Sequence, residues 1–141
     1  MTPTDIANVK RTFAMVAPIA DRAGLMFYEK LFALDPTLRP MFADDITEQS
    51  KKLMHVLAVA ANGIDRLDTL VPIVQALGVR HVDYKVKDEH YDTVGTVLIS
   101  TLQAGLGDEF TPEVKSAWLN AYVLLSGIMK DAAHKASTAQ A

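Results

Sequence analysis

Cysteine is absent from this 141-residue sequence, and tryptophan occurs once. The absence of cysteine excludes disulfides, thiolate metal sites, iron–sulfur clusters and cysteine nucleophiles. Any metal must therefore be held by carboxylates or by one of the four histidines.

Long apolar runs and an excess of one charge are also missing. No apolar run approaches the roughly 18 residues of a transmembrane helix, and residues 1–5 lack the basic flank and apolar region of a signal peptide. The net charge is −3, from 14 basic and 17 acidic residues. The basic residues are scattered, which leaves no stripe to follow a phosphate backbone. We therefore expect a cytoplasmic protein without nucleic-acid or membrane partners.

The hydrophobic residues that are present follow a helical period almost everywhere, with few alternating β-branched runs. This pattern predicts an all-α fold. A chain of this length can bury roughly 68 to 70% of its unfolded surface around a single core. We expect one domain over residues 1–135 and a disordered tail over 136–141.

Helix start and stop signals divide the chain into segments. The expected helices begin near Thr4-Asp5, Pro18, Thr47, Asp68-Thr69, Asp88 and Thr111. Thr47 and Thr111 are the expected capping residues of their helices. A turn at Asp35-Pro36 leads into a short apolar segment, residues 38–42, and residues 83–86 look irregular.

Only one histidine faces clearly into the apolar stripe of its own helix. His81 lies about 20° from Leu70, whereas His55 and His134 point to the opposite faces of their helices, and His90 is ambiguous. An inward imidazole followed by irregular chain can bind haem iron through one nitrogen while the other nitrogen donates to a carbonyl. By position alone, a core histidine with a satisfied hydrogen bond is the commoner explanation.

Two further polar groups lie on inward helix faces. Tyr28 is surrounded by Gly24, Leu25, Leu31 and Phe32, and Gln49 lies about 40° from Leu53 on its helix. A tyrosine hydroxyl and a glutamine amide in one apolar cavity can donate hydrogen bonds to a bound diatomic ligand. Each of these side chains can also be partly exposed or bonded to backbone. Tyr28 and Gln49 therefore support a haem site only in combination with His81.

The order of these features resembles the globin family, specifically bacterial globins similar to the haem domain of flavohaemoglobins. The resemblance spans about residues 6–129. The stretches that carry it are Phe27-Tyr28-Glu29-Lys30-Leu31-Phe32, Met41-Phe42, Gln49-Ser50-Lys51-Lys52-Leu53, Arg80-His81, Glu89-His90-Tyr91-Asp92-Thr93-Val94-Gly95 and Ala117-Trp118.

The resemblance implies a globin fold of about seven to eight helices around haem b. It makes His81 the proximal iron ligand and places Phe42 against the haem. It assigns the distal pocket to Tyr28, Gln49 and Leu53. Tyr91 would lie near His81, and the other implied haem contacts are Leu57, Val86, Val94, Leu98 and, at a propionate, Lys52.

Two departures from the family pattern bear on function. The chain has no Gly-rich dinucleotide motif, which implies an external reductase. The family has a glutamate near the proximal histidine, but its register falls on Ala133 here, with Asp131 as a conceivable substitute. Without that carboxylate, peroxidase-like chemistry is in doubt.

We therefore expect a globin that binds O2, and also NO or CO, for oxygen scavenging or retention, as a monomer or weak homodimer. The alternative is a nitric oxide dioxygenase or nitrite reductase that works with a separate reductase. Gas sensing is less expected because it normally requires an output domain.

Overall fold

The computed structural model describes the chain except residues 43, 84–86 and 141, and except the side chains of residues 81–83, 88 and 137–140. Every regular element within the described ranges is helical, which confirms the all-α prediction. The α-helices are α1 (Pro3–Val16), α2 (Ala20–Leu34), α3 (Thr47–Gly63), α4 (Leu67–Asp83), α5 (Asp88–Leu106) and α6 (Pro112–Gln140), and the 3₁₀ segments are η1 (Ala17–Ile19), η2 (Pro36–Met41) and η3 (Gly107–Glu109).

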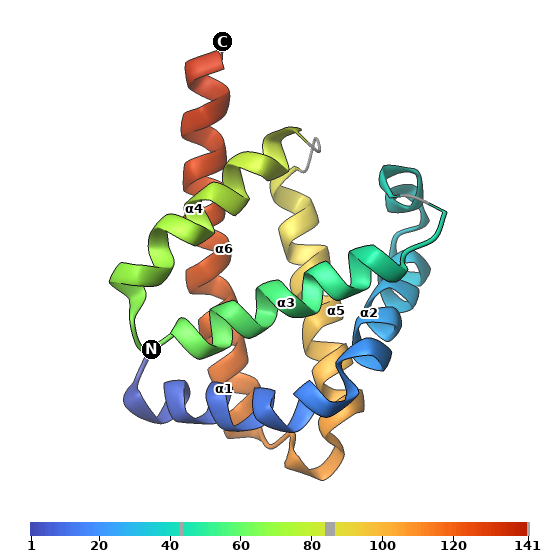
Figure 1. The fold of residues 1–141 in the computed structure, drawn as a ribbon, viewed down its shortest axis with the longest axis vertical. Coiled ribbons are helices and arrows are strands. Elements are labelled where there is room, and N and C mark those ends of the chain that lie inside the picture. Colours follow the sequence, from blue (N-terminus) through green and yellow to red (C-terminus); the bar gives the residue numbers. More distant parts are fainter. Residues whose placement is uncertain (43, 84–86, 141) are drawn as a thin grey trace.

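The helices cross at steep angles. α5 and α6 run along the long axis, α3 and α4 cross them, and α1 closes one end of the domain (Figure 1). The most extensive helix pair is α4 with α6, followed by α1 with α6, and α2 packs on both α3 and α5. No helix in the described ranges is long and apolar enough to cross a membrane.

Six α-helices are present in the described chain rather than the seven or eight expected. The apolar segment after Asp35 forms η2, a 3₁₀ helix that contains Pro36 and Pro40. Proline lacks the amide hydrogen that an α-helical interior requires. The Asp35 carboxylate instead accepts a hydrogen bond from the Thr37 amide at 3.1 Å and starts the tighter turn.

Several helix starts differ by one or two residues from those expected. α1 begins earlier, because the Thr2 side chain caps it and forms a reciprocal capping box with Asp5. Thr47 is the first residue of α3 and not its cap, and the Asp45 carboxylate accepts from the Thr47 amide at 2.9 Å. The Thr111 prediction is confirmed, since its hydroxyl accepts from the Val114 amide at 3.2 Å.

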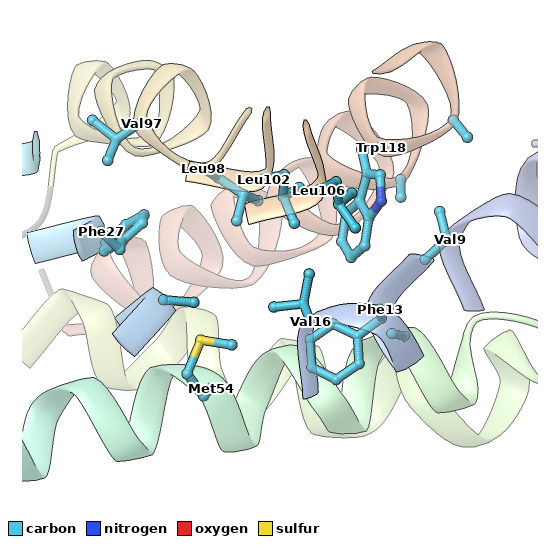
Figure 2. Packing of buried hydrophobic residues seen from close by; sticks show 14 of the residues in the cluster. Val9, Phe13, Val16, Phe27, Met54, Val97, Leu98, Leu102, Leu106 and Trp118 are labelled. Atoms are coloured by element: carbon cyan, nitrogen blue, oxygen red, sulfur yellow. The ribbon is translucent and has the colours of Figure 1, made fainter. Parts of the chain in front are cut away.

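The core contains one buried polar contact between distant helices. Trp118 of α6 packs its ring near Phe13 of α1, with 6.4 Å between the centroids (Figure 2). Its indole nitrogen donates to the Thr12 hydroxyl at 2.9 Å, and that hydroxyl donates to the Asn8 carbonyl at 2.6 Å. Thr12 therefore satisfies the indole N–H in the interior between α1 and α6.

Replacing Thr12 by valine keeps the side-chain shape but removes the acceptor for the buried indole N–H. We expect the free energy of unfolding to fall by about 1 to 3 kcal/mol, the cost of an unsatisfied buried donor. Thr101→Val is the matched control, because the Thr101 hydroxyl bonds only the Val97 carbonyl of its own helix, at 2.8 Å. Denaturant unfolding of both variants measures the difference, and equal losses would contradict the assigned role.

The inward faces of α2 and α3 depart in part from the expected stripes. Leu25 is 39% exposed, and Phe27 is buried instead. On α3 the apolar side chains of Met54 and Ala61 are buried, while Leu53 and Leu57 are half-buried. Two neighbouring faces of α3 are thus apolar, one packed in the core and one only partly covered.

Candidate functional site

Tyr28 lies at the centre of an aromatic cluster. Its ring is 4% exposed and contacts three phenylalanines, with centroid distances of 5.1 Å to Phe27, 5.9 Å to Phe32 and 5.4 Å to Phe42. The first two come from α2 itself, and Phe42 comes from the end of η2. The hydroxyl group is therefore held in largely apolar surroundings.

Gln49, in the first turn of α3, reaches this hydroxyl. Its side chain is half-buried and lies close enough to the Tyr28 hydroxyl to lower the pKa of that group. Burial raises the pKa of Tyr28 above its ordinary value, and the contact with Gln49 offsets part of that rise. The phenol therefore remains protonated and able to donate at neutral pH.

Arg39 fixes the segment that carries Phe42. Its guanidinium lies over the Phe32 ring, 5.0 Å from the centroid. It also donates to the Phe42 carbonyl at 3.4 Å and to the Asp44 carbonyl at 2.7 Å. These contacts hold η2 against α2, and the Phe32 and Phe42 rings lie 5.5 Å apart.

Behind this cluster lies a small apolar cavity of about 20 Å³, bounded mainly by α1, α2, α3 and α5. That is room for about one water-sized molecule, but walls of this character favour an apolar occupant. Three of its lining residues, Leu53, Leu57 and Leu98, are among those expected to contact haem. The cavity therefore adjoins the side chains predicted to form the pocket.

His81 lies two residues before the end of α4, on the stripe predicted for it. The buried side chains of Leu70 and Val74 lie on the same helix face, and Leu77 is half-buried. The His81 side chain lies outside the described part of the structure, as does the whole of Val86. Iron ligation by His81 and haem contact by Val86 therefore stay predictions.

A second cluster of polar side chains surrounds Tyr91 at the start of α5. Tyr91 is buried, and its carbonyl accepts a hydrogen bond from the Tyr122 hydroxyl at 2.5 Å. Burial, and then the nearby Tyr91 and Asp92, raise the pKa of Tyr122 far above its ordinary value. The Lys130 ammonium lies 5.5 Å from the Tyr91 ring centroid and 4.0 Å from the Asp92 carboxylate.

The sequence analysis did not identify Tyr122, Lys130 or Arg39 in these contacts. Each contact joins residues far apart in the chain or depends on the path of η2. No sequence pattern separates Lys130 from the other lysines, and only the crossing of α5 and α6 brings it to Tyr91.

Asp131 does not take the place of the family's glutamate, contrary to the alternative that we considered. Its side chain is 66% exposed and pairs with Lys135 at 3.1 Å on the surface of α6. Ala133, where the register of the glutamate falls, is half-buried and has no acidic group. The described residues therefore provide Lys130, and not a carboxylate of α6, beside Tyr91.

The remaining histidines and Lys52 lie at the surface or at a helix cap. His55, His134 and Lys52 are exposed, as expected for the two histidines. His90, which was ambiguous, accepts a hydrogen bond from the Lys87 amide through Nδ1 at 3.0 Å and so helps to cap α5.

The apolar residues around the aromatic cluster fit a flat apolar group better than a bare metal ion. Phe42, Leu53, Leu57 and Val94 are only partly buried although each packs against the core. Half-covered apolar faces of this kind are what haem would cover on binding. Within the described residues no group of three or more histidines and carboxylates gathers to hold a metal.

Comparisons with known proteins identify the family of the chain and agree with its all-α fold. Residues 25–129 match the family model described as Globin. The chain is 36% identical over 136 residues to a Flavohemoprotein of Bacillus subtilis, covering 89% of this chain and 33% of the relative. It is 29% identical over 134 residues to a Flavohemoprotein of Vibrio cholerae, covering 93% and 34%. The chain thus spans about a third of the length of these relatives.

One solved structure is also similar over nearly its whole length. It is a bacterial globin from Campylobacter jejuni, with a TM-score of 0.85 and 26% sequence identity. The match covers 95% of this chain and 97% of that one, so the two folds correspond over nearly their whole lengths.

Proposed function

Because the chain belongs to the globin family, we propose that it holds haem b through His81 and binds O2, and also NO or CO, between α3 and the aromatic cluster of α2. The haem supplies an iron atom with an open coordination position for the gas. His81 holds the iron from α4, Phe42 packs against the ring, and the half-buried apolar residues exclude water.

The observation that carries this proposal is the pairing of Tyr28 and Gln49 in apolar surroundings. The two side chains come from different helices and meet where the family resemblance puts the distal pocket. Donors at this point can stabilise a bound ligand that carries partial negative charge. Two ordinary hydrogen bonds contribute about 1 to 3 kcal/mol in total, which lowers the dissociation constant about fivefold to 150-fold. Slow ligand release of this kind suits scavenging or retention of oxygen.

The test is the visible absorption spectrum of the haem-reconstituted protein, reduced without oxygen and then exposed to air. We expect a five-coordinate, high-spin ferrous spectrum that converts to a persistent oxygenated one. A six-coordinate ferrous spectrum would mean that an internal ligand occupies the gas site, and failure to take up haem would remove the proposal.

A second candidate function is nitric oxide dioxygenation with a separate reductase. It is favoured by the relatives named Flavohemoprotein, of which this chain matches about a third. The position of Ala133 and the exposure of Asp131 weaken the case for further oxygen activation. Sustained consumption of NO with a reductase and NADH would support this function, whereas a single stoichiometric reaction would not. Anaerobic turnover of nitrite with the same reductase tests the remaining alternative.

A further inference from the structure

Of the glycines in the described chain, the one with the least space for a side chain lies one turn before His81. A Cβ atom built on Gly78 of α4 would lie 2.8 Å from the Cα and 2.9 Å from the carbonyl carbon of Met129 on α6, and closer still to its carbonyl oxygen. Real Cβ contacts are essentially never below 3.0 Å. Only glycine therefore allows α4 to lie directly on the backbone of α6.

The contact at Gly78 affects the position of His81, which lies three residues further along α4. His81 lies about 4.5 Å along the helix axis from Gly78 and about 60° around it. A helix moves as a rigid body over such a distance, so the depth of α4 on α6 at Gly78 sets the position of the His81 backbone. Binding geometry is sensitive to displacements of about 0.5 Å.

We propose that Gly78 is a positioning residue for the iron ligand: its contact with the Met129 backbone sets the depth of α4 and so the strain in the bond between His81 and the iron. This inference rests on the proposed function of His81. The obstacle is main chain and not the Met129 side chain, so repacking of side chains does not relieve it. Any side chain at position 78 must move α4 away from α6 by at least a few tenths of an ångström.

The test compares Gly78→Ala with two other glycine-to-alanine changes. Gly127→Ala is on α6 and has open space around it, and Gly24→Ala crowds the Ser50 carbonyl at 3.0 Å, far from α4 in the chain. We expect only Gly78→Ala to shift the iron–histidine stretching band of the ferrous protein to lower frequency. We also expect roughly tenfold faster haem loss, the effect of an overpacking cost of about 1.4 kcal/mol. Adding Met129→Ala should not reverse the shift.

A second variant pair separates positioning from general distortion. In His81→Gly, free imidazole supplies the ligand, which is then no longer tied to α4. Adding Gly78→Ala to this variant should leave the iron–imidazole band unchanged. A shift of the iron–imidazole band in this variant, whose ligand is not attached to α4, would overturn the positioning role. An iron–histidine band of Gly78→Ala identical to that of the wild type would overturn it too.

The outcomes distinguish the inference from the proposed function. A wild-type protein with no iron–histidine band would refute the function itself. If the single variant Gly78→Ala does not retain haem, the change is combined with Gly127→Ala. Gly127→Ala removes a glycine from a helix interior and adds up to about 1 kcal/mol of stability. Loss of helical circular dichroism there too would show that Gly78 serves folding and not ligand position.

Discussion

His81→Ala is expected to abolish stable haem ligation while leaving the fold in place. His81 lies at the end of the buried stripe formed by Leu70 and Val74, on the helix face expected to meet the haem. Without its imidazole the iron has no protein ligand on that side, and the ferrous spectrum should lose the five-coordinate histidine signature. Spectroscopy of the reconstituted variant measures this loss, and added imidazole should restore the signature.

The other histidines provide the controls for this prediction. His55→Ala and His134→Ala remove exposed imidazoles, so the iron spectrum should remain that of the wild type. His90→Ala removes the acceptor for the Lys87 amide and should lower stability without changing the ligation state. An unchanged spectrum in His81→Ala, or a loss of ligation in one of the controls, would remove His81 from the site.

Much of the fold follows from hydrophobic spacing alone. The long α5 helix is an example: the helical period puts Tyr91, Val94, Leu98, Leu102 and Leu106 on one face, and all of them are buried except Val94, which is partly buried. The exposure of His55 and His134 also follows from their angles to the apolar stripe. These features depend only on the helical period, which the sequence states directly.

Features that depend on the crossing of two helices could not be predicted in this way. The periodicity of α2 marks Leu25 as inward, but the partners of that helix bury Phe27 and leave Leu25 at the surface. No sequence pattern marks Gly78 as a close contact, because the backbone that crowds it belongs to α6. Arg39 acts through Phe32 and the Phe42 carbonyl, and that contact requires the 3₁₀ path of η2.

In the candidate site, too, the sequence predicts which side chains face inward but not the contacts between helices. The helix angle of Gln49 and the apolar neighbours of Tyr28 predict two inward polar groups, whereas the interaction between them depends on the packing of α2 against α3. The family resemblance supplied the expectation that they share one pocket. Phe42 was also expected from the resemblance, whereas the structure adds Arg39, which donates to the Phe42 carbonyl beside Tyr28.

Tyr28→Phe and Gln49→Leu are each expected to speed O2 dissociation by about tenfold, the effect of losing one hydrogen bond of about 1.4 kcal/mol. The two effects should not multiply in the double variant. The side chains interact with each other, so removing one also changes the surroundings of the other. We therefore expect the double variant to lose O2 much less than a hundredfold faster than the wild type. Stopped-flow displacement of O2 by CO measures all four rates.

Matched variants outside the pocket test whether these effects are local. Tyr122→Phe removes a partly buried hydroxyl that donates to the Tyr91 carbonyl, and Gln103→Leu changes an exposed glutamine of α5, so neither should alter O2 release. Because burial raises the pKa of Tyr28, its phenol stays a donor, and the wild-type rate should be constant from about pH 6 to about pH 9. Unchanged rates in both distal variants, or an acceleration below pH 9 that Tyr28→Phe removes, would contradict the assignment of Tyr28 as a neutral hydrogen-bond donor.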